Sequence, residues 1–117
     1  MSIKIYHNPK CSKSRKTLEL LQEREIEPEI INYLETPPTT DELEQILAML
    51  NMTPSQLMRT KEAVYSSAGL DNSALTAREL VELMVANPSV IERPIVVANG
   101  RAAIGRPPEQ VLELFKD

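Results

Sequence analysis

The chain has 117 residues, of which 42% are apolar and 26% charged, and this composition predicts a single globular domain over residues 1–117. No apolar run approaches the roughly 20 residues that cross a bilayer, and the first residues lack a secretory signal, so we expect a cytoplasmic protein with no membrane partner. A single cysteine, Cys11, and a single histidine exclude a disulfide framework and predict no bound metal. Four aromatic residues and a net charge of -4 argue against nucleic-acid binding.

The first third of the chain predicts a strand, a helix and a second strand. Apolar and polar residues alternate over residues 2–6, as in a half-buried strand, and a polar turn covers residues 7–14. A helix that ends at about Arg24 is then predicted by Thr17, Leu18 and Leu21, which recur at helical spacing. Residues 29–33 form a second apolar segment. Strand, helix and strand within about 30 residues indicate a βαβ unit with parallel strands.

The middle of the chain predicts a helical segment over about residues 39–90. Thr39 with Glu42 and Thr76 with Glu79 each have the spacing of a capping box at the start of a helix. Between them we expect a short helix from Thr53 to about residue 58 and another over residues 61–67.

The last part predicts a hairpin and a helix. Residues 94–98 and 101–104 flank Asn99-Gly100, a strong two-residue hairpin signal. Pro107-Pro108 then begins a helix that presents one apolar side, made of Val111, Leu114 and Phe115. The predicted fold class is therefore α/β: a thioredoxin-like core (βαβ then ββα, with a mixed sheet) that carries a helical insertion at about residues 39–90.

Cys11 is the strongest candidate for chemistry. Residues 1–18 carry five basic and no acidic side chains, a charge of +5, whereas the remaining 8 basic and 17 acidic residues carry -9. The cysteine lies where a strand turns into a helix, so the helix N-terminus and the cations Lys10, Lys13 and Arg15 favour a thiolate. A lone cysteine is often only a small apolar filler, but the flanking Lys10 and Ser12 provide no apolar context. We therefore expect the pKa of the Cys11 thiol to lie below that of an ordinary cysteine.

The spacing around Cys11 excludes two common cysteine mechanisms. A phosphatase loop needs an arginine six positions later, where the chain has Thr17, and a CxxC redox pair needs a second cysteine where it has Ser14. The Ser14 hydroxyl can still tune the thiolate, as can Arg15. His7 can tune the thiol, act as a base or serve a structural role in the turn.

Five motifs occur in order over essentially the whole chain. They are His7-Asn8-Pro9-x-Cys11-x-x-Ser14-Arg15-x-Thr17-Leu18, Tyr33-Leu34-Glu35-x-Pro37-Pro38, Leu57-Met58-Arg59, Glu92-Arg93-Pro94-Ile95-Val96-Val97 and Gly105-Arg106-Pro107. Together they resemble the glutaredoxin-coupled arsenate reductase family.

The resemblance implies a thioredoxin-like fold and the reduction of arsenate to arsenite, in which the Cys11 thiolate attacks arsenate and forms a covalent arsenic adduct. It implies no bound cofactor, glutathione as co-substrate and glutaredoxin as protein partner. It further implies that arsenate or a related oxyanion binds Arg59, Arg93 and Arg106, whose planar guanidinium groups suit such ligands. It also implies a cis peptide bond at Pro94.

Two other functions remain open at this stage. Non-enzymatic thiol-stress regulators that bind RNA polymerase share the fold, although they typically carry a CxxC pair and this chain has Ser14. A general monothiol, glutathione-dependent oxidoreductase is the other alternative, and assays on glutathionylated substrates and on arsenate would separate it from an arsenate reductase.

Overall fold

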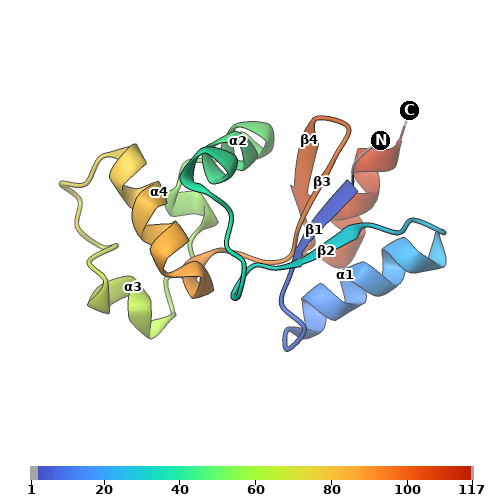
Figure 1. Cartoon of the computed structure of the whole chain (residues 1–117), viewed down its shortest axis with the longest axis horizontal. Coiled ribbons are helices and arrows are strands. Elements are labelled where there is room, and N and C mark those ends of the chain that lie inside the picture. The colour runs from blue at the N-terminus through green and yellow to red at the C-terminus, as the bar shows by residue number, and fades with distance from the viewer. Residues whose placement is uncertain (1–2, 117) are drawn as a thin grey trace. The chain divides into compact units, whose positions relative to one another are not determined.

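The computed structural model describes residues 3–116, which form two compact units (Figure 1). The first contains the described residues up to Thr36 and those from Arg93 onward, and the second is Pro37–Glu92. The second unit corresponds to the helical insertion expected at about residues 39–90. The single domain over residues 1–117 stays a prediction. No helix in the described part of the chain is long and apolar enough to span a membrane.

The first unit is built on a four-stranded mixed sheet in the order β2-β1-β3-β4. β1 is parallel to β2 and antiparallel to β3, and β3 is antiparallel to β4, which confirms the predicted topology. The first predicted strand, residues 2–6, is in fact one residue longer at its C-terminal end, and residue 2 lies outside the described residues. The strands are β1 (Ile3–His7), β2 (Glu29–Asn32), β3 (Ile95–Ala98) and β4 (Arg101–Ile104).

Helix α1 (Ser12–Glu23) begins inside the segment that was predicted to be a polar turn. Its buried side chains, Ser14, Thr17 and Leu21, recur at helical spacing and form its inner face. The inner face begins with a serine rather than an apolar residue, so a prediction from the apolar residues alone places the start of the helix too late.

The C-terminal helix differs from the prediction in type, because η3 (Pro108–Phe115) is a 3-10 helix. A 3-10 helix has three residues per turn, so residues three apart lie on one line. The buried residues Pro108, Val111 and Leu114 have that spacing, whereas Phe115 is only partly buried. The apolar side was predicted correctly, but its period of three favours the tighter helix.

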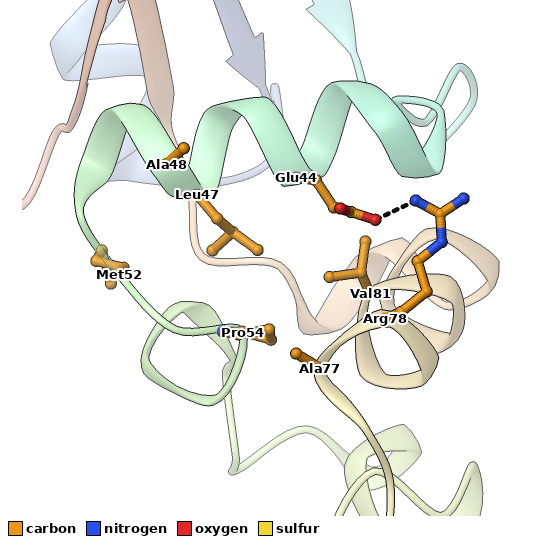
Figure 2. A pocket seen from close by; sticks show the side chains of 8 residues that line it. All are labelled: Glu44, Leu47, Ala48, Met52, Pro54, Ala77, Arg78 and Val81. Carbon is orange, nitrogen blue, oxygen red and sulfur yellow. Dashed lines mark hydrogen bonds and ion pairs between the residues drawn. The ribbon is translucent and has the colours of Figure 1, made fainter.

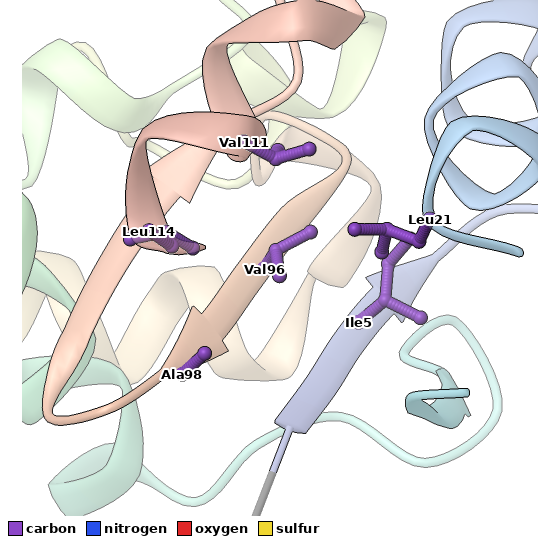
Figure 3. Packing of buried hydrophobic residues seen from close by; sticks show 6 residues of the cluster. All are labelled: Ile5, Leu21, Val96, Ala98, Val111 and Leu114. Carbon is purple, nitrogen blue, oxygen red and sulfur yellow. The ribbon is translucent and has the colours of Figure 1, made fainter. Parts of the chain in front are cut away.

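One hydrophobic cluster joins α1 and η3 to a single face of the sheet (Figure 3). Side chains alternate between the two faces of a strand, so Val96 and Ala98 share the face on which Ile5 lies opposite Val96. Burial of each large aliphatic side chain contributes about 1.5–3 kcal/mol. The buried members are Ile5, Leu21, Val96, Ala98, Val111 and Leu114.

The second unit is helical, and both predicted capping boxes are present. The Thr39 hydroxyl accepts from the Glu42 N–H at 3.1 Å, while the Glu42 carboxylate accepts from the Thr39 N–H at 2.8 Å. Thr76 and Glu79 make the same exchange at 3.1 and 2.9 Å. The elements are α2 (Thr40–Leu50), η1 (Ser55–Leu57), α3 (Ala63–Ser67), α4 (Ala77–Ala86) and η2 (Pro88–Val90).

Helices α2 and α4 pack together and border a pocket of about 240 Å³ (Figure 2). The Arg78 side chain from α4 forms ion pairs with Glu44 and, at 3.1 Å, with Asp41, both on α2. The Arg78 side chain is about half exposed. The pocket is lined by Glu44, Leu47, Ala48, Met52, Pro54, Ala77, Arg78 and Val81.

Candidate active site

Cys11 occupies the N-cap position of α1, directly after the loop that follows β1. Its backbone is extended, its N–H donates to the Asn8 carbonyl at 3.0 Å, and its carbonyl accepts from the Arg15 N–H at 3.0 Å. The side chain is partly exposed. The first helical N–H groups have no partner within the helix, so they are available to the sulfur. This is the predicted position at the turn from strand to helix.

The pKa of the Cys11 thiol lies below its ordinary value. Burial raises this pKa, but the backbone N–H of Ser14 and the side chain of Arg93 donate hydrogen bonds that lower it. The backbone N–H of Lys13 and the positive charge of Arg93 lower it further. The predicted direction is therefore confirmed, with helix N–H groups and an arginine far along the chain among its causes.

Arg93 and Arg106 both reach the sulfur of Cys11. An Arg106 Nη2 lies 3.7 Å from Cys11 Sγ, and the Arg106 Nε donates to the Arg93 carbonyl at 2.9 Å. Burial lowers the pKa of Arg93, but interactions with Tyr33 and Cys11 outweigh burial, so the pKa of Arg93 is raised. The Arg93 guanidinium therefore stays charged beside the thiolate.

The hairpin register explains why these two arginines meet. Ile95 is paired with Ile104 across β3 and β4, and the same register continues beyond the strands, where the Gly105 N–H donates to the Pro94 carbonyl at 3.0 Å. Continuing this register by one more residue pair places Arg93 opposite Arg106. The two-residue Asn99-Gly100 turn fixes this register. The hairpin signal in the sequence therefore indicated that Arg93 and Arg106 lie opposite each other, whereas the spacing of the motifs alone did not.

His7 and Ser14 form a buried pair beneath the cysteine loop. The His7 Nδ1 and the Ser14 Oγ are 2.5 Å apart, and the same hydroxyl accepts from the Asn8 N–H at 3.0 Å. Burial lowers the pKa of His7, and the charge of Arg15 lowers it further, so the imidazole is neutral at pH 7. The hydroxyl of Ser14 thus contacts His7 and the loop backbone, while its N–H acts on the thiol.

Arg15 lies on the exposed side of the same loop. One Arg15 Nη1 donates to the Pro9 carbonyl at 3.0 Å, so the guanidinium bridges α1 and the loop before Cys11. Its charge acts on His7. The roles predicted for Arg15, His7 and Ser14 in tuning the thiolate stay predictions.

Arg59 belongs to the second unit, and its convergence with Cys11 also stays a prediction. There the Arg59 Nε lies 3.3 Å from a Glu62 carboxylate oxygen, and its Nη1 lies 3.0 Å from one of Glu92. The guanidinium that the resemblance assigns to an oxyanion is thus held by two carboxylates.

Two residues near the site carried no predicted role. Tyr33, which is 1% exposed, follows β2 and hydrogen-bonds to Arg93. Gly105 packs so closely on Thr17 and Pro94 that a Cβ would not fit. The Arg93–Pro94 bond is cis, as the resemblance implied, and so is the Arg106–Pro107 bond.

The fold and the site define a class of protein: a thioredoxin-like domain in which one cysteine of lowered pKa contacts two arginines. The ArsC family matches residues 6–114. The sequence is 55% identical to the uncharacterized protein YfgD of Escherichia coli, over 96% of this chain and 95% of that one. It is 47% identical to the arsenate reductase of Neisseria meningitidis, over 93% and 94%.

A solved structure gives the same result. An arsenate reductase from Vibrio cholerae is 50% identical, covers 97% of this chain and 98% of its own, and superposes with a TM-score of 0.93. The chain therefore belongs to the ArsC family, which confirms the resemblance seen in the five motifs.

Proposed function

We propose that this protein is a glutathione- and glutaredoxin-dependent arsenate reductase in which Cys11 is the nucleophile. The observation that carries the proposal is the contact of Arg93 and Arg106 with the Cys11 sulfur. A thiolate and an oxyanion repel each other, and two guanidinium groups at the sulfur offset that repulsion where the two must meet. The similarity to arsenate reductases in both sequence and structure supports arsenate as the oxyanion.

The first step is a condensation. The Cys11 thiolate attacks arsenic(V), a sulfur–arsenic bond forms, and one arsenate oxygen leaves as water after taking up protons. The arsenic is not yet reduced. In this step Arg93 and Arg106 hold the oxygens whose negative charge the attack increases, and the helix N–H groups keep the sulfur deprotonated beforehand.

The reduction needs a second thiol, and this chain has only Cys11. The glutathione thiolate attacks the Cys11 sulfur, a disulfide forms, and the electron pair of the sulfur–arsenic bond stays with arsenic, which leaves as arsenite. The two sulfurs have thus supplied the two electrons. A glutaredoxin thiolate then attacks the glutathione sulfur of the mixed disulfide and regenerates the Cys11 thiolate.

The test supplies the full chain with glutathione, glutaredoxin and their reductant, and measures the reductant consumed with and without arsenate. We expect consumption only with arsenate, none with Cys11→Ser, and little when thioredoxin and its reductase replace the glutathione system. Omission of glutaredoxin should leave one glutathione on Cys11, detected by mass spectrometry. Consumption with glutathionylated substrates but not with arsenate would instead indicate a general monothiol oxidoreductase.

A further inference from the structure

Two exposed lysines flank Cys11 along the chain. Lys10 directly precedes the cysteine and Lys13 lies in the first turn of α1, and both are exposed, whereas Cys11 is partly exposed. In the part of the chain that the structure describes, both lysines form hydrogen bonds through backbone atoms, and neither ammonium group pairs with an acidic side chain. Both charges therefore face solvent beside the candidate nucleophile.

The fold fixes the backbone of both lysines. Asn8, which is 7% exposed, accepts from the Lys10 N–H with its side-chain oxygen at 3.0 Å and from the Cys11 N–H with its carbonyl at 3.0 Å. The Lys13 carbonyl accepts from the hydroxyl of the buried Thr17 at 2.8 Å. The loop and the first turn of α1 thus hold one lysine on each side of the cysteine in the sequence.

The other basic side chains of residues 10–16 have partners within the chain. The Arg15 guanidinium donates to a carbonyl of the preceding loop at 3.0 Å, and Lys16 lies 4.0 Å from a carboxylate oxygen of Glu19. Lys13 lowers the pKa of the Cys11 thiol through its backbone N–H, so its ammonium group is not required for that effect. The charges of Lys10 and Lys13 are therefore available to a molecule that approaches from solvent.

Glutathione has the charges that suit such a surface. Its thiol lies between two carboxylates, one toward each end of the molecule, and with its thiol deprotonated it carries a net charge of about -2. Opposite charges attract appreciably within a Debye length, about 10 Å at 0.1 M salt, and such attraction raises the rate of encounter. A thiol flanked by two carboxylates thus complements a cysteine flanked by two ammonium groups.

We propose that Lys10 and Lys13 form an exposed docking surface for the carboxylates of glutathione. This inference rests on the proposed function, because it takes glutathione as the thiol that attacks Cys11. The two lysines attract the incoming anion, whereas Arg93 and Arg106 contact the sulfur itself. The second thiol of the reaction therefore has a surface of its own.

The first test uses the full chain without arsenate. The Cys11 thiolate attacks glutathione disulfide, a mixed disulfide forms on Cys11 and a glutathione thiolate leaves. Mass spectrometry follows this rate and the rate with hydroxyethyl disulfide, a neutral probe, at low salt and at a pH where the thiol is ionised. Their ratio cancels changes in the reactivity of the sulfur. We expect Lys10→Gln and Lys13→Gln each to lower the ratio about two- to fivefold, because each removes one charge that attracts an anion.

Two kinds of control variant accompany these measurements. Lys10→Arg and Lys13→Arg keep the charge and should keep the wild-type ratio. Lys116→Gln removes an exposed charge at the end of η3 that lies away from Arg106, and it should leave the ratio unchanged. Added salt should lower the ratio of the wild type more than that of the Gln variants.

The second test measures turnover with arsenate, where each Gln variant should raise the KM for glutathione about two- to fivefold and change kcat less than twofold. If the wild type does not reduce arsenate, the proposed function fails while disulfide exchange still tests the surface. A wild-type ratio in both folded Gln variants would overturn the inference. A raised KM for glutaredoxin with an unchanged ratio would also overturn it, because the surface would then serve the protein partner.

Discussion

Gly105 connects the packing of the first unit to the candidate site, and Gly105→Ala tests that connection. A Cβ at this position would lie 2.8 Å from Pro94 Cγ and 3.1 Å from Thr17 Cγ2, and closer still to Thr17 Oγ1. Thr17 is fully buried in α1, and its hydroxyl donates to the Lys13 carbonyl at 2.8 Å. The threonine cannot turn away without losing that hydrogen bond, so α1 and the loop of Gly105 must move apart.

The magnitude follows from these contacts. Overpacking a rigid interior costs about 1–3 kcal/mol, and loss of the Thr17 hydrogen bond adds about 1 kcal/mol. We expect Gly105→Ala to lower the free energy of unfolding by about 2–4 kcal/mol, which corresponds to roughly 4 °C in Tm per kcal/mol for a chain of this size. Because Arg106 is the next residue, the displacement should also move its guanidinium away from the Cys11 sulfur and slow alkylation of the thiol.

The assay is urea unfolding followed by circular dichroism, with two comparisons. Gly69→Ala makes the same substitution where nothing lies within 4 Å of the new Cβ, so only its positive φ of 79° should cost stability, about 1 kcal/mol. In a Thr17→Ala background, Gly105→Ala should cost at least about 1 kcal/mol less than it does alone. An equal cost in both backgrounds, or a cost no greater than that of Gly69→Ala, would refute the packing argument.

Two further predictions concern the charges at the sulfur. Arg93→Ala and Arg106→Ala should each lower kcat/KM for arsenate about 10²–10³-fold, with partial recovery by lysine and little change in Arg78→Ala. Equal effects of Arg93→Ala and Arg78→Ala would contradict the site. The rate of Cys11 alkylation should fall with decreasing pH only below the pKa of an ordinary thiol, about 8.5, because the folded protein favours the thiolate. Arg93→Ala should move this profile to higher pH, and a wild-type midpoint at or above that of a small thiol would contradict the lowered pKa.

The fold was predictable where local signals agree with the tertiary structure. The capping boxes at Thr39 and Thr76 and the Asn99-Gly100 turn depend on neighbouring residues only, and each appears where the sequence predicts it. Both turn residues have positive φ, 57° and 72°, as this kind of hairpin requires. The C-terminal helix differs because its prolines and its apolar spacing of three suit a 3-10 helix that packs against the sheet. Such a choice depends on packing, which local propensity does not report.

The site was less accessible from the sequence, because its electrostatics come from residues distant along the chain. The basic cluster around Cys11 correctly indicated a lowered thiol pKa, but Arg15 uses its guanidinium on the Pro9 carbonyl. The guanidinium that lowers the pKa of the Cys11 thiol comes from Arg93, which the tertiary structure brings to the loop. The Tyr33 contact with Arg93 likewise depends on how the chain continues beyond β2, and no local pattern specifies it.

The three arginines implied by the motifs show why residue type and motif do not settle function. Arg93 and Arg106 are brought opposite each other by a hairpin register, and both contact the Cys11 sulfur. Arg59 has the same guanidinium, but a turn and a paired segment place Glu62 and Glu92 against it. A motif shows only that an arginine is present. The affinity of that arginine for an anion also depends on which acidic side chains the fold places beside it.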